Sequence, residues 1–254
     1  MNSLNALTLS LIFLIPQIFM IRSSLATTIA VLKTHSEIVA GADSMGLFVT
    51  GKKRISYSFC KIHEVHDFFI ASAGFYDTRA GQRLNITEIV RNVTKRGDPL
   101  AVALNRSSDA IVSALSQFLS ETRTDDALYN LLVRGNIMTF FFGFEDGKPA
   151  VYMNRTVITP REQSSTPSIE STQEKCGPLC IPPDNPYLMH TPSQAIDDFR
   201  SKNPDLLRDD SVAFVRSLIF SDIAANKNRS GPPVDILRLD QSGPTWIDKK
   251  PNCP

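Results

Sequence analysis

A threonine at the start of a mature chain is a complete catalytic unit. Its hydroxyl can attack a carbonyl carbon, and its own α-amine can accept the proton that the hydroxyl loses. Thr27 becomes such a residue if the chain is cut after Ala26, because Ser24 and Ala26 form the small-x-small pattern of a secretory cleavage site. The chemistry that this residue offers is cleavage of an amide through an acyl-enzyme ester.

The segment before Thr27 predicts export. Residues 7–21 form a nearly unbroken apolar run, shorter than the roughly 20 residues of a membrane-spanning helix. We therefore interpret residues 1–26 as a cleaved secretory signal peptide and residues 27–254 as the mature domain. The alternative is an uncleaved anchor, which would block the amine of Thr27. No later segment is long and apolar enough to span a membrane, so we expect a secreted protein, or one in the secretory-pathway lumen, without membrane contact after cleavage.

Sequons and cysteines agree with this compartment. Five Asn-x-Ser/Thr sequons lack a central proline and predict a glycoprotein, with acceptors at Asn85, Asn92, Asn105, Asn154 and Asn228. Four cysteines in an exported chain predict disulfide bonds. Cys176 and Cys180 could close a small loop, which would leave Cys60 and Cys253 as the other pair, but the sequence allows three pairings.

Charge and histidine content argue against other classes of function. The formal net charge is +1 and no basic run occurs, so nothing supports nucleic-acid binding. The four histidines show no ligand spacing with the cysteines. We therefore expect no metal and no other cofactor.

The elements that must position Thr27 alternate between groups of strands and groups of helices. Short β-branched or apolar runs predict strands at 28–32, 37–42, 61–65, 68–73, 138–144, 149–153, 234–239 and 245–247. Helical periodicity predicts helices at 76–95, 99–120, 191–199 and 209–226. The Pro- and Ser-rich residues 160–190 predict a long loop. This order predicts an α+β fold, a four-layer α-β-β-α sandwich of two mainly antiparallel sheets flanked by helices.

Four local matches, in order along the chain, resemble the β-subunits of the proteasome and its bacterial relatives, which are N-terminal nucleophile hydrolases. They are the mature start Thr27-Thr28-Ile29, the small-residue run 40–44 that contains Asp43, the segment 60–63 that contains Lys61, and the strand end 70–74 followed by Asp77-Thr78. The resemblance covers most of residues 27–150 and returns at 231–247. It implies a proteasome β-type domain.

The resemblance also implies a role for each matched residue. Lys61 would lower the pKa of the Thr27 amine and hydroxyl through its positive charge, and Asp43 would keep Lys61 charged and oriented. The backbone N–H of Gly74 would stabilise the oxyanion that forms on the attacked carbonyl. Each residue has a plainer alternative, since Asp43 could cap a turn, Lys61 could be a solvated lysine and Gly74 could simply serve a turn.

The second half of the chain departs from the family pattern. The family has a Gly/Ser loop before its third helix, which has no match here, although Ser193 could replace its serine. Ser230-Gly231 matches another serine of the family's site, but Lys227 stands where the family places an aspartate. The sequence therefore predicts an intact attacking trio with altered surroundings.

Two functions follow from this interpretation. The first is a secreted threonine-type amidohydrolase, most like a proteasome-family peptidase, that acts on a peptide or a small amide. The alternative is a catalytically silent module with an extracellular binding or structural role. Asn85 and Asn92 share a face of the first predicted helix, and glycans there would obstruct assembly into a ring. We therefore expect no four-ring proteasome.

Overall fold

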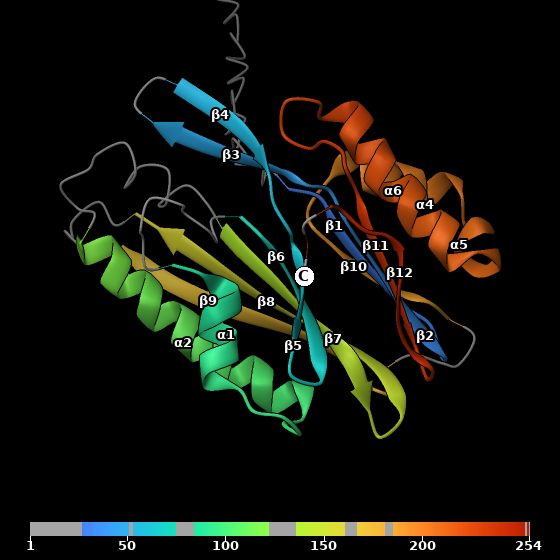
Figure 1. The fold of residues 1–254 in the computed structure, drawn as a ribbon, viewed down its shortest axis with the longest axis horizontal. Coiled ribbons are helices and arrows are strands. Elements are labelled where there is room, and N and C mark those ends of the chain that lie inside the picture. The colour runs from blue at the N-terminus through green and yellow to red at the C-terminus, as the bar shows by residue number, and fades with distance from the viewer. Residues whose placement is uncertain are drawn as a thin grey trace, which may run out of the picture.

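The computed structural model contains two stacked sheets with helices on both outer faces (Figure 1). It describes residues 27–50, 53–74, 84–121, 136–160, 167–180, 185–251 and 253. The signal peptide expected at residues 1–26, and with it the cleavage after Ala26, lies outside these residues. The predicted α+β sandwich is confirmed.

The first sheet joins the beginning and the end of the described chain. Its strands are all antiparallel, and their order is β10 (Tyr187–His190), β1 (Ile29–Lys33), β2 (Glu37–Ala42), β11 (Asp235–Asp240) and β12 (Gly243–Asp248). Strand β11 pairs directly with β2, so that Ala42 lies opposite both Ile29 and Asp235. Residues that flank these strand ends therefore meet at one end of the sandwich.

The second sheet is an antiparallel meander. It contains β5 (Ile62–Val65), β6 (Phe68–Ala73), β7 (Asn136–Glu145), β8 (Lys148–Thr159) and β9 (Ser168–Cys176). A separate hairpin of β3 (Met45–Thr50) and β4 (Lys53–Ser58) connects the two sheets along the chain. Figure 1 shows this hairpin extending from one end of the sandwich.

Helices cover the outer face of each sheet. The second sheet carries α1 (Ile86–Val93) and α2 (Leu100–Glu121), and the first carries α4 (Gln194–Lys202), α5 (Leu206–Asp209) and α6 (Ser211–Ala225) (Figure 1). No helix among the described residues is both long and apolar enough to cross a membrane.

Three apolar clusters hold the four layers together. One lies between the sheets and the other two lie beneath the helices. Strand β7 contributes to two of them, because Phe140 and Phe142 face the other sheet while Phe141 faces the helices. Each of these three rings is fully buried, and burial of such a side chain contributes about 1.5–3 kcal/mol. A strand buried on both faces explains the continuous apolar run in its sequence.

The predicted long loop at residues 160–190 is wrong in part. It contains the nine-residue strand β9 and the short strand β10. Most side chains of β9 are exposed and polar because the strand lies at a sheet edge, so it gives no apolar alternation that would predict a strand. The first residue of α4 is Gln194, and Ser193 caps it in place of the expected start near Thr191.

Candidate active site

Five chain segments meet at one end of the sandwich. Thr27 precedes β1, Asp43 follows β2, Lys61 precedes β5 and Gly74 follows β6. Backbone hydrogen bonds tie these segments in pairs, since Asp43 N donates to Thr28 O at 3.1 Å and Ser72 N donates to Lys61 O at 3.2 Å. The fifth segment, which leads into β11, adds Ser230 and Gly231. Antiparallel pairing thus brings together residues that are far apart in the sequence.

Asp43 links the predicted nucleophile segment to Lys61. Its Oδ1 accepts the Thr28 backbone N–H at 2.8 Å and also the ammonium of Lys61. Thr27, the residue before this N–H, is buried with 6 % of its surface exposed. The start of β1 and the lysine are therefore held by a single carboxylate oxygen.

The Asp43 carboxylate has a full set of donors. Its Oδ2 accepts the backbone N–H of Met45 and that of Gly231, both at 3.1 Å. Burying a charged group is costly unless it is paired and hydrogen-bonded. Three N–H donors and the Lys61 ammonium meet that requirement for a side chain that is fully buried. Asp43 caps the turn at Met45, as the plainer alternative expects, and also holds Lys61 and two distant backbone N–H groups.

Lys61 is fully buried, which excludes the alternative of a solvated lysine. Burial lowers the pKa of Lys61 to about 8, and the negative charge of Asp43 opposes this effect. The ammonium also lies 5.3 Å from the centre of the Phe59 ring, within the range of a cation–π contact. Lys61 is therefore a cation that loses its proton far more readily than an ordinary lysine.

A second carboxylate, which the sequence analysis missed, lies on the other side of β1. Asp222 of α6 is buried and accepts hydrogen bonds from the hydroxyls of Thr28, Ser193 and Ser230, the last at 3.0 Å. The Thr28 and Ser230 hydroxyl oxygens are 2.8 Å apart. Asn226 completes the set by donating to Asp222 at 2.8 Å.

This arrangement corrects the charge reversal inferred from Lys227. That lysine is exposed in the turn after α6. The carboxylate beside Ser230 comes instead from Asp222, which lies in α6, earlier in the chain than the family motif places its aspartate. Ser193 belongs to the same network, since its hydroxyl donates to Asp222, and whether it replaces the family's serine stays a prediction. Asp222 could have been found as an acidic residue on the apolar stripe of its helix, below Leu218 and Ile219.

Gly74 lies where β6 ends and has a φ of 100°. This is a left-handed conformation that glycine adopts without steric cost. Asp77 and Thr78 lie outside the described residues. The structure therefore supports a sharp turn at Gly74, and its role towards an oxyanion stays a prediction.

The sequon asparagines differ in accessibility. Asn92, Asn105 and Asn228 are exposed, and Asn85 is half-buried at the start of α1, where its Oδ1 accepts Glu88 N at 3.1 Å. Asn154 is 1 % exposed and its side chain bonds to Thr156 and Ser171 hydroxyls. A glycan at Asn154 therefore has no room in this fold.

Both disulfides of one allowed pairing are formed. Cys60 bonds to Cys253 and Cys176 bonds to Cys180. Among the described residues, no group of three His, Cys, Asp or Glu side chains is placed to hold a metal ion. The disulfides agree with an oxidising compartment.

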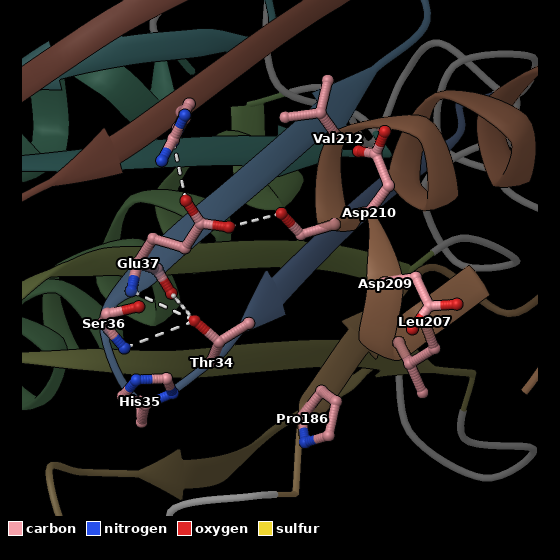
Figure 2. A pocket seen from close by; sticks show the side chains of 11 residues that line it. Thr34, His35, Ser36, Glu37, Pro186, Leu207, Asp209, Asp210 and Val212 are labelled. Atoms are coloured by element: carbon pink, nitrogen blue, oxygen red, sulfur yellow. Dashed lines mark hydrogen bonds and ion pairs between the residues drawn. The ribbon is translucent and has the colours of Figure 1, made fainter. Parts of the chain in front are cut away.

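A cavity of about 490 Å³ lies at the other end of β1, away from Thr27. Figure 2 shows the interactions at this end gathered around Glu37 and Thr34, whose hydroxyl bonds to the backbone of Ser36 and Glu37. Glu37 accepts from the Ser211 hydroxyl and pairs with Arg238 at 2.7 Å, while Asp210 caps α6 through Ala213 N at 2.8 Å. The carboxylate beside the Ser211 hydroxyl is already paired with the Arg238 guanidinium, which makes Glu37 a weak base. The residues around Thr27 therefore form the better candidate site.

Comparisons with known proteins show the fold. No family model matches the chain. No curated protein matches it either. Among solved structures, Anbu (ancestral beta-subunit) from Yersinia bercovieri is similar with a TM-score of 0.50 and 9% identity, over 89% of each chain. An Anbu (Gly-1) mutant from Hyphomicrobium sp. strain MC1 has a TM-score of 0.47 and 12% identity, over 89% of this chain and 90% of that one.

These findings correct the expected membership among proteasome β-subunits. The structure that matches with a TM-score of 0.50 is Anbu (ancestral beta-subunit), a family distinct from the proteasome β-subunits that the motifs resemble. At 9% identity the likeness shows a shared fold and no more. The function must therefore be argued from the residues at the site.

Proposed function

We propose that the mature chain is an exported threonine-type amidohydrolase that uses the Thr27 hydroxyl as nucleophile and the Thr27 α-amine as base. The observation that carries this proposal is the shared oxygen of Asp43, which holds both the first N–H after Thr27 and the buried ammonium of Lys61. An N-terminal amine has a reference pKa of about 8. A fixed positive charge nearby lowers that value, so the amine is neutral and able to accept a proton near neutral pH.

The reaction then runs in two halves. The Thr27 oxygen attacks the amide carbonyl carbon while its proton passes to the α-amine, and an oxyanion forms on the carbonyl oxygen. The C–N bond breaks as the α-ammonium returns that proton to the leaving amine, which leaves an ester on Thr27. Water attacks the ester with the same amine as base and releases the acid. Gly74 N–H is our candidate donor to the oxyanion.

Asp222 keeps the start of β1 in place during these steps. Through the Thr28 hydroxyl it holds the residue next to the nucleophile, and Ser193 and Ser230 anchor the carboxylate from two other segments. Because the nucleophile is already held in position, no conformational entropy has to be lost to orient it during the reaction. The substrate class is a peptide or a small amide. Cleavage after Ala26 would make export and activation one event.

The test begins with the secreted protein. N-terminal sequencing should give Thr27 as the first residue, and a β-lactone probe should add one acyl group to the intact mass. Thr27→Ala should lose both the label and amide hydrolysis, whereas Thr27→Ser, which keeps the hydroxyl and the amine, should retain them in part. A mature start elsewhere, or undiminished labelling of Thr27→Ala, would favour a catalytically silent module.

A further inference from the structure

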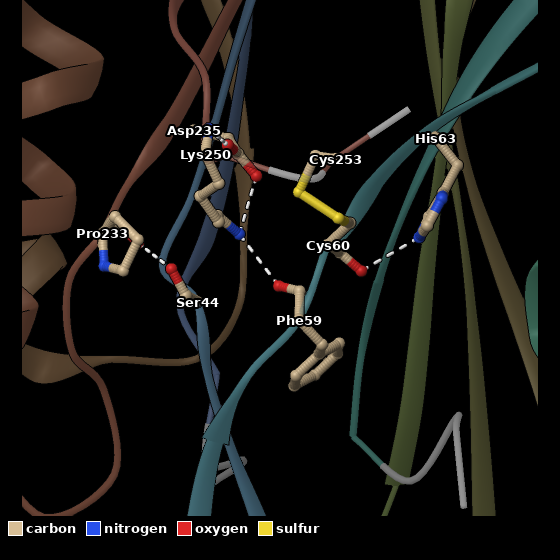
Figure 3. The surroundings of a disulfide bond; sticks show 8 residues. All are labelled: Ser44, Phe59, Cys60, His63, Pro233, Asp235, Lys250 and Cys253. Carbon is tan, nitrogen blue, oxygen red and sulfur yellow. Dashed lines mark hydrogen bonds and ion pairs between the residues drawn. A yellow bond between two sulfur atoms is a disulfide. The ribbon is translucent and has the colours of Figure 1, made fainter. Parts of the chain in front are cut away.

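A second buried lysine lies behind the Asp43–Lys61 pair. Lys250 is 4 % exposed, and its ammonium is 2.7 Å from Asp235 Oδ2 and donates to the Phe59 carbonyl at 2.9 Å. Its backbone N–H donates to Asp235 Oδ1 at 2.8 Å. Figure 3 shows Lys250 reaching from the C-terminal segment between Asp235 and Phe59. Two hydrogen bonds and one ion pair hold this buried lysine in position.

Phe59 connects this lysine to the proposed site. Its carbonyl accepts from Lys250, its N–H donates to Ser44 O at 3.2 Å, and its ring lies 5.3 Å from the Lys61 ammonium. Ser44 follows Asp43 directly, and Lys61 comes two residues after Phe59. Lys250 therefore holds the short segment that places Lys61 opposite Asp43.

A disulfide holds Lys250 in turn. Cys253 bonds to Cys60, which lies between Phe59 and Lys61 (Figure 3). The Cys253 N–H also donates to Lys250 O at 3.3 Å, so the cysteine and the lysine belong to one hydrogen-bonded turn. The bridge thus joins the segment that carries Lys250 to the segment that carries Lys61.

We propose that Lys250 is a positioning residue for the Thr27 site, and that the Cys60–Cys253 disulfide keeps it in place, so that full activity requires the oxidised C-terminal segment. This inference rests on the proposed amidohydrolase function and deepens it. It gives the disulfide a part in activity beyond stability.

The charges around Lys61 give this role a specific signature. The charged groups that act on it are Asp43, Asp235 and Lys250, and the charge of Lys250 lowers the pKa of Lys61 while that of Asp235 raises it. His63 of β5 lies near the same two outer residues, and burial lowers its pKa. Removal of Lys250 and removal of Asp235 should therefore move the titration of Lys61 in opposite directions.

The first experiment compares Lys250→Met, Asp235→Asn and the double variant in the secreted protein. Lys61 titration is followed by NMR of ¹³C-labelled lysine, and amide hydrolysis by its pH profile. Lys250→Met should raise the pKa of Lys61 by roughly 0.3 to 1 unit and should raise by the same amount the pH at which activity falls on the alkaline side. Asp235→Asn should lower both values. The double variant, which removes a buried pair together, should fold and titrate close to the wild type. Lys250→Arg keeps the positive charge, so its activity should fall on the alkaline side at the same pH as that of the wild type. Equal titration of Lys61 in all variants would overturn the proposal.

The second experiment removes the Cys60–Cys253 disulfide. Cys60→Ser with Cys253→Ser should reduce kcat at least several-fold and move the alkaline limb in the same direction as Lys250→Met. Cys176→Ser with Cys180→Ser is the matched control and should leave both unchanged. If the variant without the Cys60–Cys253 disulfide keeps the kcat and pH profile of the wild type, the disulfide does not hold Lys250 in place for activity. Absence of Thr27-dependent hydrolysis in the wild type would instead refute the proposed function, while the NMR titration would still test Lys250.

Discussion

At the scale of single residues, the site is defined by two buried carboxylates on either side of the start of β1. Asp43 accepts from backbone N–H groups and from Lys61, whereas Asp222 accepts from hydroxyls. Asp43 therefore holds the charged ammonium of Lys61 in place, and Asp222 holds together the segments that carry the three hydroxyls. Both surround Thr28, so the position of Thr27 is set by its neighbour.

The depressed pKa of Lys61 predicts a narrow pH range for activity. Below the pKa of the Thr27 amine the base is protonated, and above about 8, the pKa of Lys61, the ammonium beside Asp43 loses its proton. The rate should therefore rise and fall around neutral pH, with an alkaline limb near pH 8. A pH profile of kcat/KM measures this. The Lys61→Arg variant keeps its positive charge at high pH, so its residual activity should persist above pH 9. If the activity of the wild type fell only beyond pH 10, Lys61 would not be the group that sets the alkaline side of the profile.

Asp222→Asn should weaken both the fold and the activity. An amide in place of the carboxylate presents a donor to hydroxyls that now donate, which costs about 1–3 kcal/mol for a buried group. Denaturant unfolding and the rate of amide hydrolysis measure the two effects. Lys227→Ala is the control, because Lys227 is exposed and should change neither. A loss of activity in Lys227→Ala equal to that in Asp222→Asn would show that position 227 matters to the site in spite of its exposure.

At the scale of elements, the close packing of α6 on β2 depends on Gly41. A Cβ at this position would come within 2.6 Å of Val215 Cγ1 and 3.1 Å of Ile219 Cγ1. The helix that carries Asp222 therefore lies at a distance from the sheet that only glycine permits. Strand β2 ends at Ala42, so the same packing also sets Asp43 relative to α6.

Gly41→Ala should lower the free energy of unfolding by about 1–3 kcal/mol, because overpacking forces the helix away from the sheet. It should also lower activity by moving Asp222. Gly143→Ala is the control, because a Cβ there would come no closer than 3.3 Å to Phe68 Cβ, a milder clash. Gly143 also lies far from the site. Chemical denaturation compares the two, and a larger loss in Gly143→Ala would contradict this account of the packing.

The sequence predicted elements well where one strand or helix carries its own signal. The apolar runs of β1, β2 and β6 and the periodicity of α2 locate those elements to within a few residues. It failed at β9, whose polar side chains owe their strand conformation to pairing with β8. Local motifs pointed to Thr27, Asp43 and Lys61, whose catalytic roles stay predictions. They did not point to Asp222, because the position of that residue depends on how α6 packs.

At the scale of the whole molecule, the two disulfides differ in what they constrain. Cys60 and Cys253 are 193 residues apart, whereas Cys176 and Cys180 are 4 apart. A cross-link that closes a long loop removes more freedom from the unfolded chain. The long-range bridge is therefore the one that stabilises the fold as a whole.

Removal of each bridge should show this difference. In the chain-entropy view, Cys60→Ser with Cys253→Ser costs roughly 5 kcal/mol, and Cys176→Ser with Cys180→Ser costs roughly 2 kcal/mol. Urea unfolding of the two double variants under non-reducing conditions measures the order. An equal or reversed order would show that native contacts, and not loop closure, dominate the effect of the bridges.

The place of β11 beside β2 also sets an order in time. The first sheet cannot close until residues 235–240 have been synthesised, long after β1 and β2. Pairing across such a separation is slow, and the open edge of β2 is exposed until it occurs. Gly231, Asp235 and Lys250 arrive in the same late stretch. A chain interrupted before Ser230 thus carries Thr27 without these contacts, so the proposed site can form only after they have been made.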